Sequence, residues 1–163
     1  MESDIDTGSS NPAAQVMLED SMLNSTPHRR GTIMLIDDSW LVRTIIEASF
    51  TRAGLPVTSY EDGFAAMRAL VRGDVGIPDI LLLDIGLPRM DGYEVARILR
   101  MNPRFQRTLI VMLTAKDGVL DRLRSRVVGA HDFITKPFRV PFVVDKMKQY
   151  LATMYPPTST DDQ

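Results

Sequence analysis

Residues 79–84 read Asp-Ile-Leu-Leu-Leu-Asp, and this stretch decides the fold class. An apolar run without polar alternation predicts a strand that is buried on both faces, as in parallel sheets covered by helices. A second run of this kind, residues 32–36, lies earlier in the chain and is followed by Asp37 and Asp38. The two runs predict the centre of a parallel sheet.

Short apolar runs alternate with helical patterns through the rest of the core. Strands are expected over 32–36, 56–60, 79–83, 108–113 and 131–135, and helices between Ser39 and Gly54, from Asp62 to Gly73, and over 93–101, 119–128 and 140–151. Five strands and five helices in strict alternation predict an α/β fold, a doubly wound five-stranded parallel sheet with helices on both faces. Right-handed crossovers favour the flavodoxin-like strand order 2-1-3-4-5.

Composition indicates one soluble domain with tails. The chain has 163 residues, of which 44% are hydrophobic and 25% charged, and it has no cysteine. This excludes a disulfide framework, a thiol nucleophile and a cysteine metal site. No window approaches the roughly 18–20 apolar residues of a membrane span, and the acidic N-terminus is unlike a signal peptide, so we expect a cytoplasmic protein that does not contact membrane. The net charge of −2 with no concentrated basic face also argues against nucleic-acid binding.

The two ends differ in composition from the core. Residues 1–30 and 156–163 are rich in polar residues and are expected to be disordered tails around a domain over 31–155. Within the first tail, the apolar segments 16–18 and 22–23 bracket Glu19 and Asp20. This pattern fits either amphipathic turns that form on docking or a solvated tail with some apolar residues.

The residues that follow the strands carry the functional information. Asp37 and Asp38 follow the first strand, Asp84 the third, Thr114 the fourth and Lys136 the fifth. Because sites in open α/β sheets form outside the carboxyl ends of the strands, we expect all five side chains in one cleft. A single Asp there could simply cap a helix, but capping does not explain three acids, a hydroxyl and a lysine together.

Three carboxylates in one cleft repel one another and call for a cation. At 4 Å, two unit charges at an effective dielectric constant of 20 cost about 4 kcal/mol. Oxygen ligands without His or Cys suit Mg²⁺, which shares its coordination with waters and phosphate. With the ammonium of Lys136 and the hydroxyl of Thr114 added, the set predicts a phosphoryl site in which a carboxylate attacks phosphorus and becomes an aspartyl phosphate.

These motifs closely resemble the receiver domain of two-component response regulators. The resemblance spans roughly residues 31–155 and is carried by the segments 35–39 (Leu-Ile-Asp-Asp-Ser), 83–92 (Leu-Asp-Ile-Gly-Leu-Pro-Arg-Met-Asp-Gly), 113–116 (Leu-Thr-Ala-Lys) and 133–138 (Phe-Ile-Thr-Lys-Pro-Phe). It implies that Asp84 is the phosphoacceptor. It also implies that Asp38 binds Mg²⁺ directly and Asp37 largely through water, with Asp84 and the carbonyl of Gly86 completing the protein ligands.

The resemblance also implies a conformational switch. Thr114 would move to bond the phosphoryl group, Lys136 would pair with a phosphoryl oxygen, and the bond from Lys136 to Pro137 would be cis. Phe133 occupies an aromatic position that turns inward when Thr114 moves, although a plain buried aromatic side chain fits the sequence equally well. Gly86 and Lys116 occupy positions that differ widely among receivers and affect the access of water.

The implied partners are a histidine kinase as phosphodonor and an output protein. The chain is expected to be a stand-alone receiver, with no enzymatic activity beyond its own phosphoryl acceptance and hydrolysis. Segment 112–133 is similar to receivers of chemotaxis-like systems and of twitching motility by type IV pili. Output is expected through the face formed by 119–128, 131–135 and 140–151, with Phe133, Arg122 and Arg126 as candidate contacts; a solvated helix face is the alternative for the arginines.

Three other functions fit less well. A phosphatase of the haloacid-dehalogenase type would need an Asp where Gly86 stands and a cap domain over its substrate. A pseudo-receiver that binds its partner without phosphorylation would not need all five site residues. A flavin or dinucleotide site would need glycines where residues 37–40 read Asp-Asp-Ser-Trp.

Overall fold

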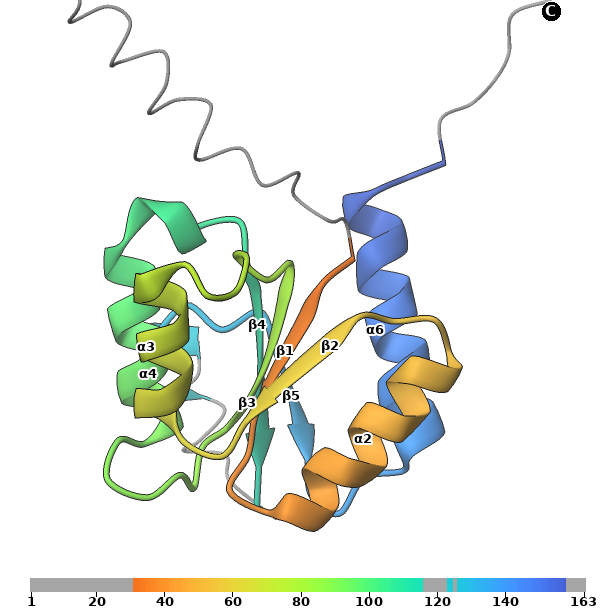
Figure 1. The fold of residues 1–163 in the computed structure, drawn as a ribbon, viewed down its shortest axis with the longest axis horizontal. Coiled ribbons are helices and arrows are strands. Elements are labelled where there is room, and N and C mark those ends of the chain that lie inside the picture. The colour runs from red at the N-terminus through yellow and green to blue at the C-terminus, as the bar shows by residue number, and fades with distance from the viewer. Residues whose placement is uncertain (1–30, 116–122, 125, 158–163) are drawn as a thin grey trace, which may run out of the picture.

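A computed structural model describes residues 31–115, 123–124 and 126–157. It contains a five-stranded parallel sheet in the order β2-β1-β3-β4-β5 (Figure 1), and the predicted fold class is therefore confirmed. The strands are β1 (Ile33–Ile36), β2 (Val57–Tyr60), β3 (Ile80–Asp84), β4 (Leu109–Thr114) and β5 (Asp132–Thr135). β3 and β4 run one residue further than predicted, so Asp84 and Thr114 are the last residues of their strands rather than the first residues of loops.

Four α-helices are complete within the described residues: α2 (Trp40–Arg52), α3 (Gly63–Arg72), α4 (Gly92–Met101) and α6 (Val140–Met154). A short 3-10 helix, η1 (Pro103–Phe105), was not predicted. Half of the expected fifth helix, 119–128, lies outside the described part of the chain; of its described residues, Leu123, Arg124, Arg126 and Val127 are helical. Five complete helices were expected, and the described residues contain four.

Two apolar layers hold the helices to the sheet. In Figure 1, α3 and α4 cover one face and α2 and α6 the other. Alternate residues of each central strand point to opposite layers: Leu81 and Leu83 pack with the α3 and α4 residues, whereas Ile80 and Leu82 pack with those of α2 and α6. All four are fully buried, as expected for a central parallel strand covered on both sides.

Side-chain caps fix where three helices begin, next to the carboxyl edge of the sheet. Ser39 accepts a hydrogen bond from the Val42 N–H at the start of α2, and Asp62 accepts one from Ala65 at the start of α3, as predicted. Asp91 and Glu94 form a reciprocal capping box at the start of α4. The loops at this edge are therefore held at both ends by regular structure.

A polar cluster attaches α6 to β5. Both Lys146 and Tyr150 of α6 donate to the Asp132 carboxylate at the start of β5, and the Asp132 carboxylate also accepts from the Phe133 N–H at 2.8 Å. Burial alone would raise the pKa of Asp132, but the hydrogen bonds from Lys146 and Tyr150 outweigh it and lower the pKa below its ordinary value. The cluster helps to fix β5, whose end carries Lys136.

We expect Asp132→Asn to lower the free energy of unfolding by about 1 kcal/mol at pH 7. Because the folded-state pKa of Asp132 is depressed, its contribution is present above the ordinary carboxyl pKa and is lost as pH falls through the folded-state pKa. Urea denaturation over a pH series should show the two proteins converging in acid. Asp145→Asn, at an exposed site on the same helix, is the control. A difference that does not change with pH would refute this account of the cluster.

Candidate functional site

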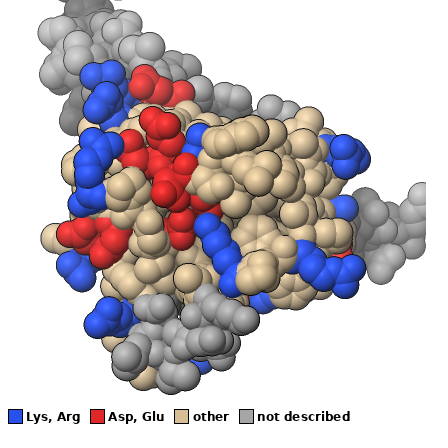
Figure 2. Space-filling view, turned by 90° about the horizontal axis from the view of Figure 1, so that it is seen from below, with Lys and Arg blue, Asp and Glu red and all other residues tan. Residues whose placement is uncertain are grey.

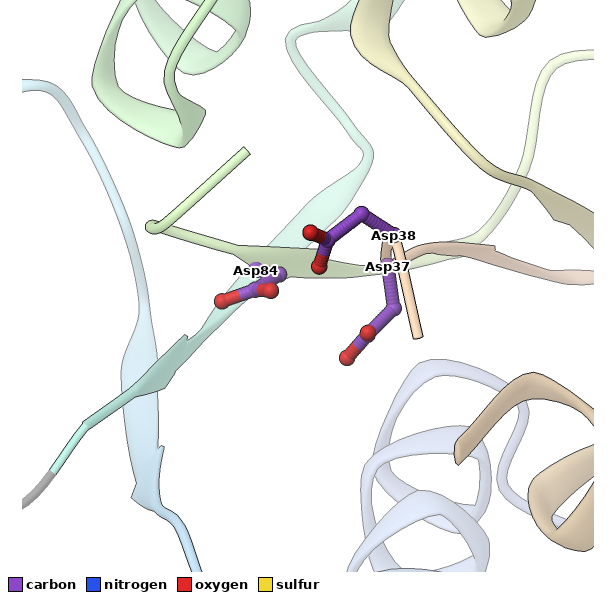
Figure 3. Close-up of side chains that lie close together, drawn as sticks. All are labelled: Asp37, Asp38 and Asp84. Carbon is purple, nitrogen blue, oxygen red and sulfur yellow. The ribbon is translucent and has the colours of Figure 1, made fainter. Parts of the chain in front are cut away.

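Three carboxylates meet at the carboxyl edge of the sheet. Asp37 and Asp38 follow β1, and Asp84 ends the neighbouring strand β3, where Ile36 pairs with Leu83. One oxygen from each carboxylate lies within 4.8 Å of the other two (Figure 3). Asp37 is fully buried and Asp84 nearly so, whereas Asp38 is exposed. The predicted convergence of the three acids is therefore seen in the structure.

The ammonium of Lys136 lies between two of these carboxylates. Its Nζ is 2.6 Å from Asp37 Oδ2 and 3.3 Å from Asp84 Oδ2. The backbone N–H of Lys136 donates to the Thr114 carbonyl, and the bond to Pro137 is cis, as expected. Burial would lower the pKa of Lys136, but the hydrogen bond to Asp37 and the charge of Asp84 outweigh it and raise the pKa. Lys136 is therefore a fixed positive charge in the cluster.

Asp84 sits in an environment that disfavours its ionised form. Burial raises the pKa of its carboxyl above the ordinary value, and the charge of Asp37 adds to that effect. Lys136 and a 3.1 Å hydrogen bond from the Gly86 N–H act in the opposite direction but do not cancel it. A cation at this position, or removal of one negative charge, would relieve the repulsion.

Thr114 ends β4 and is 3% exposed. It pairs with Thr135 of β5, and Asp84 of β3 pairs with the preceding residue, Leu113. Thr114 and Lys136 thus flank Asp84 from the β4–β5 side, while Asp37 and Asp38 flank it from β1. Figure 2 views this edge from below: acidic side chains gather in the middle of the face, and most basic side chains lie toward its rim.

The structure describes some of the other predicted site and partner-contact residues and leaves others outside the described part of the chain. Gly86 is exposed, and a Cβ at that position would lie 3.8 Å from Asp84 Oδ1, at ordinary van der Waals distance. Phe133 is partly buried against the α3–α4 layer, and Arg126 is exposed. Lys116 and Arg122 lie outside the described residues, as do the predicted tails apart from Pro156 and Pro157.

Two arginines that support the site were not predicted. Arg43 of α2 donates to the backbone carbonyl of Asp37 at 2.6 Å and thereby holds the loop after β1. Arg89, in the loop after β3, pairs with Asp62 at 2.8 Å and lies 5.5 Å from the centre of the Phe64 ring. Asp62 was predicted as a helix cap only. The sequence carries no signal that the loop after β3 forms an ion pair with the start of α3.

Gly92 allows the start of α4 to approach the end of β3 closely. A Cβ on Gly92 would lie 2.4 Å from the carbonyl oxygen of Asp84 and 2.9 Å from the Cα of Ile85. These are backbone atoms, which cannot move aside as a flexible side chain can. Only glycine therefore fits between α4 and the end of β3.

We expect Gly92→Ala to lower the free energy of unfolding by about 3 kcal/mol, because the clash forces α4 away from β3. Chemical denaturation measures this directly. The matched control is Gly76→Ala, where a Cβ meets no atom within 4 Å. If both substitutions changed stability equally, close approach would not be the reason for glycine at position 92.

The structure is an α/β protein with three carboxylates and a lysine at the carboxyl edge of its sheet, and comparison with known proteins identifies its family. The sequence model of the family described as the response regulator receiver domain matches residues 33–148 of this chain. The chain therefore belongs to the response regulator receiver family, and the family prediction is confirmed. Receiver domains of this family act in phosphorylation-based signalling and generally have no enzymatic activity beyond it.

Several bacterial proteins are similar to this chain over most of its described core. The chain is 32% identical to Protein PilG of Pseudomonas aeruginosa over 124 residues, covering 76% of this chain and 90% of PilG. It is 34% identical over 121 residues to the alkaline phosphatase synthesis transcriptional regulatory protein PhoP of Bacillus subtilis, covering 73% of this chain and 48% of PhoP. The chemotaxis protein CheY4 of Vibrio cholerae has the same fold, with a TM-score of 0.67 and 24% identity over 75% of this chain and 99% of CheY4.

None of the helices in the described residues combines the length and apolar character needed to cross a membrane.

Proposed function

We propose that this chain is a phosphoryl-accepting response regulator whose receiver domain spans residues 31–155 and whose acceptor is Asp84. The observation that carries the proposal is the position of the Lys136 ammonium, 2.6 Å from Asp37 and 3.3 Å from Asp84, beside a cluster of three carboxylates. A lysine held there supplies positive charge at the point where a phosphoryl group on Asp84 would place its oxygens.

Mg²⁺ is the cation that we propose for the cluster. The donor set fits it, because the three carboxylates offer oxygen ligands close to one another and the exposed Asp38 leaves the cluster open to water. We assign Asp37, Asp38, Asp84 and the carbonyl of Gly86 as the ligands. When bound, the cation would neutralise charge on the carboxylates and on the incoming phosphoryl oxygens.

In the proposed reaction, an oxygen of the Asp84 carboxylate attacks phosphorus. The bond from phosphorus to the donor nitrogen of a kinase phosphohistidine breaks as the new aspartyl oxygen–phosphorus bond forms, and the imidazole leaves. Lys136 stabilises the negative charge on the phosphoryl oxygens, and Thr114 donates its hydroxyl to one of them. The small side chain of Ala115, which is exposed, leaves room for the donor.

The same contacts provide the proposed signal. Thr114 and Lys136 can engage the phosphoryl group only in one arrangement, so phosphorylation biases an existing two-state equilibrium. Phe133 is the aromatic residue that we propose reports the movement of Thr114. The output partner would bind at β5, α6 and the helical residues 123, 124, 126 and 127, a face that includes Arg126.

The proposed setting is cytoplasmic control of type IV pili or of a chemotaxis-like system. Two observations support it: the similarity of segment 112–133 to receivers of such systems, and the match to PilG over 90% of that protein. The phosphodonor would be a histidine kinase, and the output would be a protein contact.

The proposal is tested by recording the intact mass after incubation with acetyl phosphate, with and without Mg²⁺. We expect a single phosphoryl adduct that forms only with Mg²⁺. Circular dichroism and a Mg²⁺ titration establish that the protein is folded and binds the cation. A folded, Mg²⁺-binding protein without an adduct would contradict the proposal and favour a binding module that works unphosphorylated, for which capture of partners by the unmodified protein is the next experiment.

A further inference from the structure

The edge of the sheet opposite the phosphoryl site carries a groove that the proposed function does not use. It has a volume of about 780 Å³ and lies where β4 begins and α6 ends. Its walls combine the apolar side chains of Ile77, Leu109 and Met154 with the cationic side chains of Arg104 and Arg107. A mixed lining of this kind suits a ligand that is apolar in part and negatively charged in part.

The two arginines of the groove, Arg104 and Arg107, are not paired with a carboxylate among the described residues. Both residues are exposed. Their loop is braced by Arg100, whose guanidinium donates to the carbonyls of Phe105 at 2.9 Å and Thr108 at 2.8 Å. The two arginines therefore extend from a fixed segment of backbone.

Asp79 brings the beginning of the described chain to the same groove. Its buried carboxylate lines the groove and accepts hydrogen bonds from the Gly31 N–H at 2.7 Å, the Thr32 N–H at 2.9 Å and the Tyr155 hydroxyl at 2.6 Å. Figure 1 shows the described chain starting at this edge, beside the C-terminal end of α6. Residues 1–30 are thus tethered at the rim of the groove.

We propose that residues 16–23 of this same chain dock in the groove. This segment has apolar residues, Val16-Met17-Leu18 and Met22-Leu23, on both sides of Glu19 and Asp20, and so matches both the apolar walls and the two arginines. Leu23 is eight residues from Gly31, and a connection of that length spans up to about 27 Å. The inference is independent of the phosphoryl chemistry.

The alternative occupants fit the groove less well. Residues 158–163 also start near this edge and contain Asp161 and Asp162, but they have no large apolar side chain. The tail of a second copy would have the right chemistry. Its concentration in solution is far below the millimolar effective concentration of a segment on a short tether, so the intramolecular contact wins.

The test uses the full-length chain, which has no cysteine, so one introduced cysteine carries one label. A nitroxide at Ala14→Cys should broaden the amide signals of groove residues such as Arg107, Leu109 and His131. In a variant with Met17, Leu18 and Leu23 all changed to Ser, broadening should fall to the level expected of a tethered coil that does not dock. Equal broadening in the two proteins would overturn the proposal.

Reversing the charges of the groove and of the docking segment provides a second test. Arg104→Glu with Arg107→Glu should lower the broadening to the same coil level, and adding Glu19→Arg with Asp20→Arg should restore it. Arg68→Glu with Arg72→Glu, exposed on α3, should leave it unchanged. If a nitroxide on one copy broadened the groove signals of another, unlabelled copy, the groove would bind the tail of a second copy. If only a nitroxide at Ser159→Cys broadened these signals, the groove would bind the C-terminal tail. Either result refutes docking of residues 16–23.

Discussion

Replacing Asp84 with asparagine is expected to eliminate the phosphoryl adduct completely. The asparagine side chain keeps the size of the aspartate but lacks the nucleophilic carboxylate, and Asp37 is fully buried against Lys136 and cannot substitute for it. Intact mass after incubation with acetyl phosphate and Mg²⁺ measures the loss. Asp38→Asn is the informative control, because it removes an exposed carboxylate of the cluster and keeps the acceptor.

The same substitution should stabilise the Mg²⁺-free protein. Because burial and Asp37 raise the pKa of the Asp84 carboxyl, its ionised form is disfavoured in the folded state. Removing that charge should raise the free energy of unfolding at pH 7 by an amount on the order of 1 kcal/mol. An adduct on Asp84→Asn, mapped by peptide mass, would show a different acceptor. A loss of stability would show that the ion pair with Lys136 outweighs the repulsion.

The centre of the fold followed from local patterns because the central strands β1 and β3 satisfy one simple requirement. Residues 80–83 must be apolar on both faces, since helices cover the sheet on both sides, and this leaves a run that periodicity detects. The convergence of Asp37, Asp84 and Lys136 was predictable for a related reason: all three lie at the carboxyl ends of parallel strands, which share one edge of the sheet. Strand order then made Asp37 and Asp84 neighbours.

The supporting contacts depend on geometry that sequence patterns do not contain. Whether Arg43 reaches the carbonyl of Asp37, or Arg89 reaches Asp62, depends on side-chain rotamers and on the path of a loop. Arg89 also has a φ of 65°, in a region that non-glycine residues rarely adopt, and no propensity indicated this. The last turn of α6 was missed as well, since the apolar period ends at Leu151, whereas the helix continues to Met154.

Lys136→Ala is expected to separate phosphorylation from its structural consequence. Asp84 keeps its carboxylate in this variant and should still accept a phosphoryl group in the presence of Mg²⁺. The ammonium that would bond the phosphoryl oxygen from the β5 side is lost, so one arrangement of the β4–β5 edge is no longer favoured over the other. Amide chemical shifts of β5 and α6 should change on phosphorylation of the wild-type protein and stay near their unphosphorylated values in the variant.

Stability gives an independent measure of the same lysine. Asp37 is fully buried, and its carboxylate would lose its only ion-pair partner among the described residues. Removing one member of a buried pair costs about 3–5 kcal/mol, and the loss should be smaller with Mg²⁺, which replaces the missing positive charge. Lys136→Arg keeps the charge and should retain most of the stability. Normal phosphorylation-dependent shifts in Lys136→Ala would refute the switching role, and unchanged stability without Mg²⁺ would refute the electrostatic one.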